Sequence, residues 1–121
     1  RRIRAALAPA GMFVMAHAQG REGIINALRA GIRSIEHGIF LDDEGIDLML
    51  ERGAWLVPTL GAGRGVIAAA DAGTVFPPGV LEKARSVVEQ HFGNVRHAIE
   101  AGWQQGRGVG AWVLGNALQP V

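Results

Sequence analysis

The sequence predicts an α/β fold in which parallel strands alternate with helices. Apolar runs of strand length recur at residues 12–18, 32–38 and 54–60, and segments with helical spacing of apolar residues lie between them. This alternation is typical of parallel strands joined by right-handed helical crossovers. In such folds the functional side chains gather at the carboxyl ends of the strands, where the loops converge.

The first strand is predicted at residues 12–18, where MFVMAHA forms an unbroken apolar run. A run of that kind is typical of a strand buried on both faces. Residues 1–9 before it have the character of a helix end, which Pro9 and Gly11 stop. A helix is predicted after it over residues 21–31, which end on a glycine. The apolar positions of this helix are Ile24, Ile25 and Leu28.

The same pattern repeats with a second strand, IRSIEHG at residues 32–38, and a helix within residues 41–53 that also ends on a glycine. Asp42, Asp43 and Glu44 stand at the start of this helix and could form a carboxylate cluster for a hard cation. Capping and favourable interaction with the helix dipole explain them more simply. The apolar face of this helix carries Ile46, Met49 and Leu50.

The third strand is predicted at AWLVPTL, residues 54–60. A glycine-rich piece with a short helix follows at residues 61–73. The proline-led segment PPGVLEKARSVVEQHFGNVRHAIEAG, residues 77–102, then predicts a long helix with a repeating apolar face. His91 and His97 lie six residues apart on it, so we expect them to point to different sides, to be unable to chelate one ion together, and to face solvent.

The motif GAGRG at residues 61–65 invites comparison with a dinucleotide-binding loop. Val66 occupies the third glycine position of the G-x-G-x-x-G fingerprint, and the expected acidic residue is missing. We interpret the motif as a flexible loop whose length suits a lid. A nucleotide-binding domain is the weakest of the functional alternatives.

Composition narrows the class of protein. The 121 residues are 49% hydrophobic with a formal net charge of +1, which is enough apolar material for one domain and provides no basic stripe for nucleic acid. There is no cysteine, so a metal would be held by His, Asp or Glu, and the cytoplasm is the expected compartment. RRIR with the following apolar run imitates a secretory signal, but Pro9 and Gly11 interrupt it, and no run has membrane-spanning length.

Two histidines end the first two predicted strands, His17 in HAQG and His37 in IEHG. If these strands are neighbours, they lie about 4.8 Å apart, and both imidazoles can reach one cation such as zinc. The plainer interpretation is a pair of hydrogen-bonded core or loop residues. Glu36 is expected on the opposite face of its strand from His37, and Thr59 at the end of the third strand could face the same pocket.

The stretch VMAHAQGREGIINALRAGIRSIEHGIFLDDEGIDLMLERGAWLVPTL resembles the metal-dependent amidohydrolase superfamily, in particular its imidazolonepropionase-like and Xaa-Pro or Xaa-Arg dipeptidase branch. In that family the fold is a (β/α)8 barrel, the fifth strand ends in HAxG and the sixth in IEHG. His17 and His37 match these positions, so the resemblance implies that both are metal ligands. It implies hydrolysis of a small amide or dipeptide by water activated on a divalent metal, zinc by preference, with one or two ions in the full enzyme.

The resemblance further implies a single partial TIM-barrel domain over residues 1–121, roughly the fifth to eighth βα units. Residues 1–102 follow the family pattern, while 103–121 depart from it. The strand-eight aspartate of the family's GTD motif is not found, since Gly115 and Asn116 stand about where it is needed, so the catalytic residue is unknown. The sequence also lacks the strand-one HxH motif, and its single lysine falls within the predicted long helix.

We therefore expect a fragment of a hydrolase, inactive alone, that needs the N-terminal half of the barrel or forms a homo-oligomer. Neither nucleic acid nor a membrane is an expected partner. The alternative is a non-catalytic α/β half-barrel remnant that acts as an association module.

Overall fold

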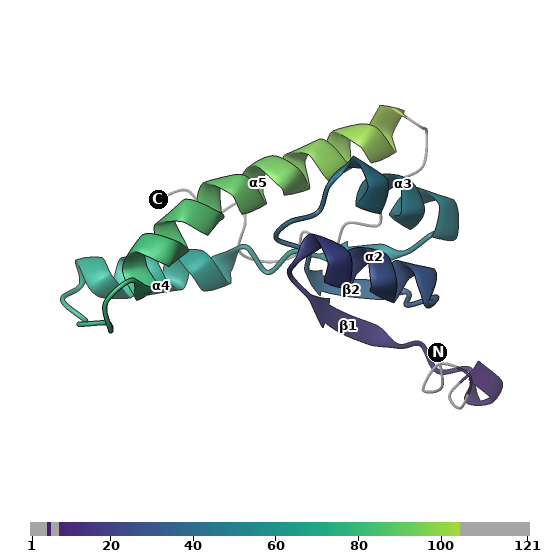
Figure 1. Cartoon of the computed structure of the whole chain (residues 1–121), viewed down its shortest axis with the longest axis horizontal. Coiled ribbons are helices and arrows are strands. Elements are labelled where there is room, and N and C mark those ends of the chain that lie inside the picture. Colours follow the sequence, from purple (N-terminus) through teal and green to yellow (C-terminus); the bar gives the residue numbers. More distant parts are fainter. Residues whose placement is uncertain (1–4, 6–7, 105–121) are drawn as a thin grey trace.

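A computed structural model of the chain describes residue 5 and residues 8–104. Within that part, three parallel strands form one sheet in the order β1-β2-β3. Figure 1 shows helices on one side of this sheet, with the long helix α5 lying across the top. The elements in chain order are η1 (Ala8–Ala10), β1 (Met15–Ala18), α2 (Arg21–Arg29), β2 (Ser34–His37), α3 (Asp43–Arg52), β3 (Trp55–Val57), α4 (Gly61–Asp71) and α5 (Val80–Gln104). The predicted alternation of parallel strands and helices is confirmed.

The core lies between the sheet and the helices that cover it. Ile24 and Leu28 of α2 and Ile35 of β2 are its most buried large side chains. Ile46 of α3 and Leu56 of β3 belong to the same buried cluster. Burying each aliphatic side chain of this kind contributes about 1.5–3 kcal/mol, so the predicted apolar faces of α2 and α3 are what hold the helices on the sheet.

Helix α3 has a capped start and a glycine stop, as its sequence predicts. The Asp42 carboxylate accepts a hydrogen bond from the Gly45 backbone N–H at 3.0 Å, and Gly53 ends the helix with a φ of +58°. Arg21 of α2 pairs with Asp42 at 2.5 Å and with Glu44 at 2.6 Å. The capping interpretation of Asp42 is therefore confirmed, and its carboxylate is engaged by an arginine and an N–H group.

Helices α4 and α5 lie side by side beyond the sheet (Figure 1). The prediction of a flexible loop at residues 61–65 is wrong, because these residues form the first turns of α4. The long helix begins at Val80 and not at the prolines, because Gly79 has a φ of +82° and breaks the helical path before it. The predicted long helix is otherwise confirmed and extends to Gln104.

The strands are shorter than their apolar runs. Strand β3 ends at Val57, because Pro58 has no N–H to donate and Thr59 has a φ of +48°. At the other end of β3, the N–H of its first residue, Trp55, donates to the carbonyl of Arg33, one residue before β2, at 2.8 Å. The sheet is therefore short in the direction of its strands. The loops that follow the strands begin before the predicted apolar runs end.

Several predicted features fall outside the described residues. The positions Gly115 and Asn116 are among them, as is most of the segment 103–121. The helix end predicted at residues 1–9 is described only at Ala5, which is helical, and in η1. Within the part that the structure describes, no helix is long and apolar enough to cross a membrane.

Replacing Asp42 by alanine should lower the free energy of unfolding by about 1 kcal/mol at pH 7, because the cap of α3 is lost. Burial alone would raise the pKa of the Asp42 carboxyl, but the Gly45 N–H and Arg21 hold that pKa below its ordinary value. Its stabilisation is therefore complete above the unfolded pKa of about 3.9 and is lost as the pH falls through the lower folded pKa. Urea unfolding of both proteins between pH 7 and pH 3 measures this.

The control for that experiment is Asp71→Ala, since Asp71 makes only a long ion pair of 3.4 Å with Arg85. This change should alter the free energy of unfolding by less than about 0.5 kcal/mol. Equal losses in the two variants would contradict the assignment of Asp42 as the cap.

Candidate functional site

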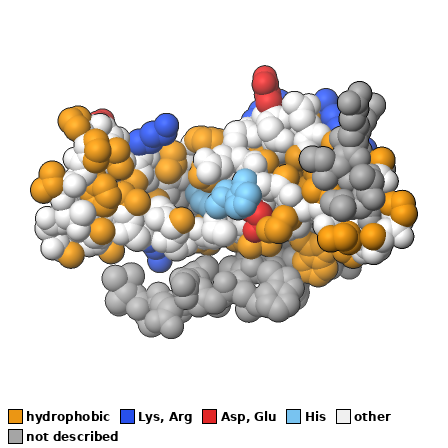
Figure 2. Space-filling view, turned by 90° about the horizontal axis from the view of Figure 1, so that it is seen from below, with side chains coloured by type: hydrophobic (Ala, Val, Ile, Leu, Met, Phe, Trp, Pro, Cys, Tyr) orange, Lys and Arg blue, Asp and Glu red, His pale blue; other side chains and the backbone are white. Residues whose placement is uncertain are grey.

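His17 and His37 meet at the carboxyl ends of β1 and β2. The His17 Nδ1 lies 2.9 Å from the His37 Nε2, and the ring centroids are 5.0 Å apart. Figure 2, which views the molecule from the sheet side, shows histidine side chains exposed in the middle of this face. The prediction that the two strands are neighbours and bring the imidazoles together is confirmed.

Strand register alone does not bring the two rings together. His17 pairs with Glu36, while His37 pairs with Ala18, whose side chain is buried on the helix side of the sheet. Paired residues in parallel strands share a face, so an extended His37 would point away from His17. His37 instead has a φ of +74°. This left-handed turn of the backbone directs the His37 imidazole to His17.

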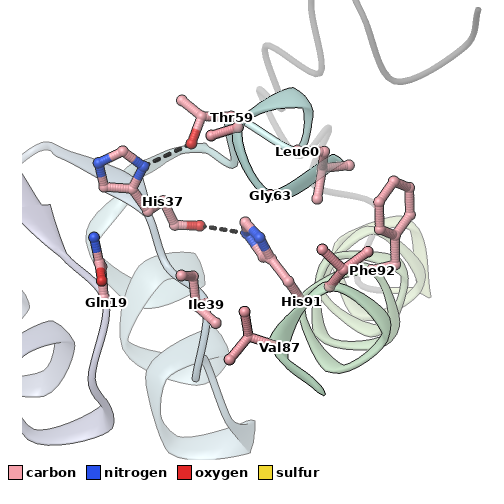
Figure 3. Close-up of a pocket in the computed structure, with 11 residues that line it drawn as sticks. Gln19, His37, Ile39, Thr59, Leu60, Gly63, Val87, His91 and Phe92 are labelled. Atoms are coloured by element: carbon pink, nitrogen blue, oxygen red, sulfur yellow. Dashed lines mark hydrogen bonds between the residues drawn. The ribbon is translucent and has the colours of Figure 1, made fainter. Parts of the chain in front are cut away.

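A left-handed conformation in a residue other than glycine costs about 1–3 kcal/mol and persists only when neighbouring groups hold it. Three hydrogen bonds do so here. The Gly38 N–H donates to the Ala18 carbonyl at 3.0 Å, and the His37 Nδ1 lies 2.6 Å from the Thr59 Oγ1. The third is donated by the His91 Nε2 of α5 to the His37 carbonyl at 2.8 Å (Figure 3).

The prediction that His91 faces solvent is wrong. His91 is only 8% exposed, and burial lowers the pKa of its imidazole, which favours the neutral form. The sequence contained a signal for this burial, because the apolar residues Val87, Val95 and Ala98 lie on the same face of the helix as His91. His97 does face solvent, and its Nε2 lies 2.7 Å from the Asp43 carboxylate. The two histidines therefore do lie on different sides of α5.

The Thr59 hydroxyl contacts one ring nitrogen of His37, and the other faces His17. The hydroxyl can accept a hydrogen bond from the Nδ1–H, which leaves the Nε2 lone pair facing His17. Two imidazole nitrogens on one tetrahedral zinc ion lie about 3.3 Å apart, so the observed separation needs only a small opening. The pair has the donor chemistry and the spacing of two ligands of one cation.

The carboxylates near the strands are engaged elsewhere. Glu36 is 6% exposed and accepts a hydrogen bond from the Ser34 hydroxyl at 2.7 Å. Glu36 pairs with His17 in register and shares its face of the sheet. The prediction that Glu36 lies on the opposite face from His37 applies only to an extended His37, because the turned His37 ring reaches the His17 side. Among residue 5 and residues 8–104, no group of three or more His, Cys, Asp or Glu side chains could hold a metal ion. The imidazole groups that the described residues bring together here are those of His17 and His37.

Comparison with protein families gives a match over nearly the whole chain. Residues 1–116 match the family described as the amidohydrolase family. An uncharacterized protein of Mycobacterium tuberculosis is 38% identical over 92 residues, which is 76% of this chain and 25% of that protein. The chain therefore spans about a quarter of the length of this curated relative.

Two solved structures resemble the fold closely. One is a Xaa-Pro dipeptidase with bound methionine in its active site, with a TM-score of 0.71 and 43% identity over 83% of this chain and 25% of that chain. The other is the ochratoxinase of Aspergillus niger, with a TM-score of 0.73 and 31% identity over 83% of this chain and 22% of that chain. The sheet and helices described above thus occur in both as part of a longer chain.

Replacing His91 by leucine should destabilise the protein by about 1–3 kcal/mol, because the buried His37 carbonyl loses its donor. His91→Gln should recover much of that loss, since the glutamine amide offers an N–H donor at a similar reach. Urea unfolding gives the free energies. The matched control is His97→Leu on the exposed side of the same helix, which should change them by less than about 0.5 kcal/mol. If His91→Leu lowered the free energy of unfolding no more than His97→Leu does, the role given to His91 would be wrong.

Proposed function

Because this chain belongs to the amidohydrolase family, we propose that it is part of a hydrolase that cleaves amide or peptide C–N bonds of small molecules with a metal-activated water. Its fold is α/β and corresponds to part of a (β/α)8 barrel. Among the similar solved structures, one is a dipeptidase and another is ochratoxinase, and the dipeptidase holds methionine in its active site. These names support a small-molecule amide or dipeptide as the substrate class.

The observation that carries this proposal is the pair of imidazole nitrogens 2.9 Å apart at the ends of two parallel strands. We assign His17 and His37 as ligands of a divalent cation, zinc by preference. When bound, such an ion lowers the pKa of a water molecule and polarises the carbonyl group under attack. The chain's own part is to hold the two rings in place, with Thr59 accepting from the His37 Nδ1–H and His91 binding the His37 carbonyl.

Two ligands do not complete such a centre. Catalytic zinc sites in proteins use three protein ligands and keep a further position for water or substrate. Because the described residues supply two, we propose that the remaining ligands and the group that takes the proton come from other parts of the full enzyme. The chain spans about a quarter of the relative it matches, which leaves room for them there.

A second candidate function is association without catalysis. On the sheet face away from the helices, Met15 is 58% exposed and Trp55 is 43% exposed, and Figure 2 shows hydrophobic side chains gathered there. Among the described strands, β1 and β3 each pair with β2 alone. Exposed apolar faces and open sheet edges favour binding to another polypeptide.

The metal assignment predicts that cobalt(II) binds to the 121-residue chain and that binding depends on both histidines. His17→Ala and His37→Ala should each weaken cobalt binding at least about tenfold, measured by titration of the visible absorbance of cobalt. His97→Ala is the control, since His97 lies on α5 and pairs with Asp43, and it should leave binding unchanged. Equal cobalt affinity in all four proteins would show that the histidine pair is not a metal site.

The association alternative predicts that the mass in solution rises with protein concentration and that Trp55→Lys reduces this rise. Light scattering during size-exclusion chromatography measures the mass. Val75→Lys is the matched control, because Val75 is 92% exposed and lies in the loop between α4 and α5. A monomer at every concentration, or equal behaviour of the two lysine variants, would exclude an interface on this face.

A further inference from the structure

A cavity of about 130 Å³ lies beside the histidine pair. His37, Thr59 and Gln19 line the side at the carboxyl ends of the strands, and helices α4 and α5 form the far wall (Figure 3). The structure brings these parts together from segments that are distant in sequence. The most apolar part of the lining consists of Ile39, Leu60, Val87, Val88 and Phe92.

The size of the cavity sets the size of what it can hold. An enclosed apolar cavity of about 150 Å³ accommodates a benzene molecule. A cavity slightly smaller than that fits an aliphatic side chain such as those of leucine and methionine. The volume alone therefore favours one side chain of medium size as the occupant.

The lining of the cavity does not favour a charged occupant. No Asp, Glu, Lys or Arg is among the described residues that line the cavity. On the helix side, the His91 Nε2 already donates to the His37 carbonyl. A charged group seated against the apolar part of the lining would lose its hydration there, at a high free-energy cost. The occupant is therefore uncharged and apolar.

Close contact between the two helices fixes the far wall. Gly63 of α4 faces Val88 of α5, and a Cβ added at Gly63 would lie 2.6 Å from the Val88 Cγ2. The absence of a side chain at Gly63 lets the helices approach closely enough to make the cavity small. The outer face of Phe92 is covered by the Arg64 guanidinium, 4.3 Å from the ring centroid.

We propose that this cavity is a specificity pocket for one uncharged, apolar side chain of the substrate, of the size of leucine or methionine, on a residue that adjoins the scissile amide. The pocket is lined by His37, a member of the histidine pair, and by Thr59, which contacts the His37 ring. A side chain seated in the pocket therefore brings its own backbone amide to the carboxyl ends of β2 and β3. The inference that this pocket binds substrate rests on the proposed hydrolase function. Its apolar selectivity follows from the lining itself.

The test uses the 121-residue chain and three probes, N-acetyl-leucinamide, N-acetyl-glycinamide and N-acetyl-lysinamide. Methyl-region NMR titration measures the affinity of each probe and shows which methyl groups shift. The leucine probe should bind at least about tenfold more tightly than the other two, and the methyl groups of Ile39, Leu60 and Val87 should shift. Equal affinities for the three probes, or shifts confined to other methyl groups, would overturn the proposal.

Val87→Phe should fill the cavity and weaken binding of the leucine probe about tenfold or more. Val80→Phe is the matched control, the same substitution on the same helix at a position that is 39% exposed and does not line the cavity, and it should leave binding unchanged. Equal behaviour of the two variants would overturn the proposal.

Cobalt titration of the same samples separates this inference from the proposed function. Selective binding of the leucine probe without cobalt binding at His17 and His37 would support the pocket and count against the metal-dependent hydrolase. Cobalt binding with no preference among the three probes would support the metal site and overturn the pocket.

Discussion

His37 leaves its strand in a left-handed backbone conformation, with a φ of +74°, and the arrangement of the site depends on that turn. Without it, the side-chain alternation of β2 would place the imidazole on the helix side of the sheet with Ala18. With it, the Nε2 faces His17 and the Nδ1 faces Thr59. A strained residue of this kind is stable only when hydrogen bonds from several directions hold it.

Helix α5 connects that turn to the rest of the molecule. His91 binds the His37 carbonyl at 2.8 Å, and one helical turn later the Asn94 amide donates to the Ile39 carbonyl at 2.8 Å. The backbone carbonyls of His37, at the end of β2, and of Ile39, just after it, are therefore both bound to α5, with only Gly38 between them. The same helix contributes Val87, Val88 and Phe92 to the cavity. The position of the His37 ring and the shape of the cavity thus depend on how this single helix packs.

The two faces of the sheet have different roles. The helix side carries the buried core around Ile24, Leu28 and Ile35. The opposite side exposes His17, Met15 and Trp55. Membership of the amidohydrolase family, together with a chain that spans about a quarter of its relative, gives a physical reason for that exposure, because in a closed barrel the inner face of the sheet is covered by the other strands.

The sequence by itself determined the order of strands and helices, the apolar faces of α2 and α3, the cap at Asp42, and the placement of His17 and His37 at strand ends, because each follows from local periodicity or short-range hydrogen bonding. Only the tertiary structure decided the direction of the His37 ring, the hydrogen bond from His91 to the His37 carbonyl, the helical start of α4 and the existence of the cavity. The hydrogen bonds that hold His37 join residues 20, 22 and 54 positions apart. Local patterns do not encode such distant partners, and a left-handed turn in a histidine arises only when those partners are in place.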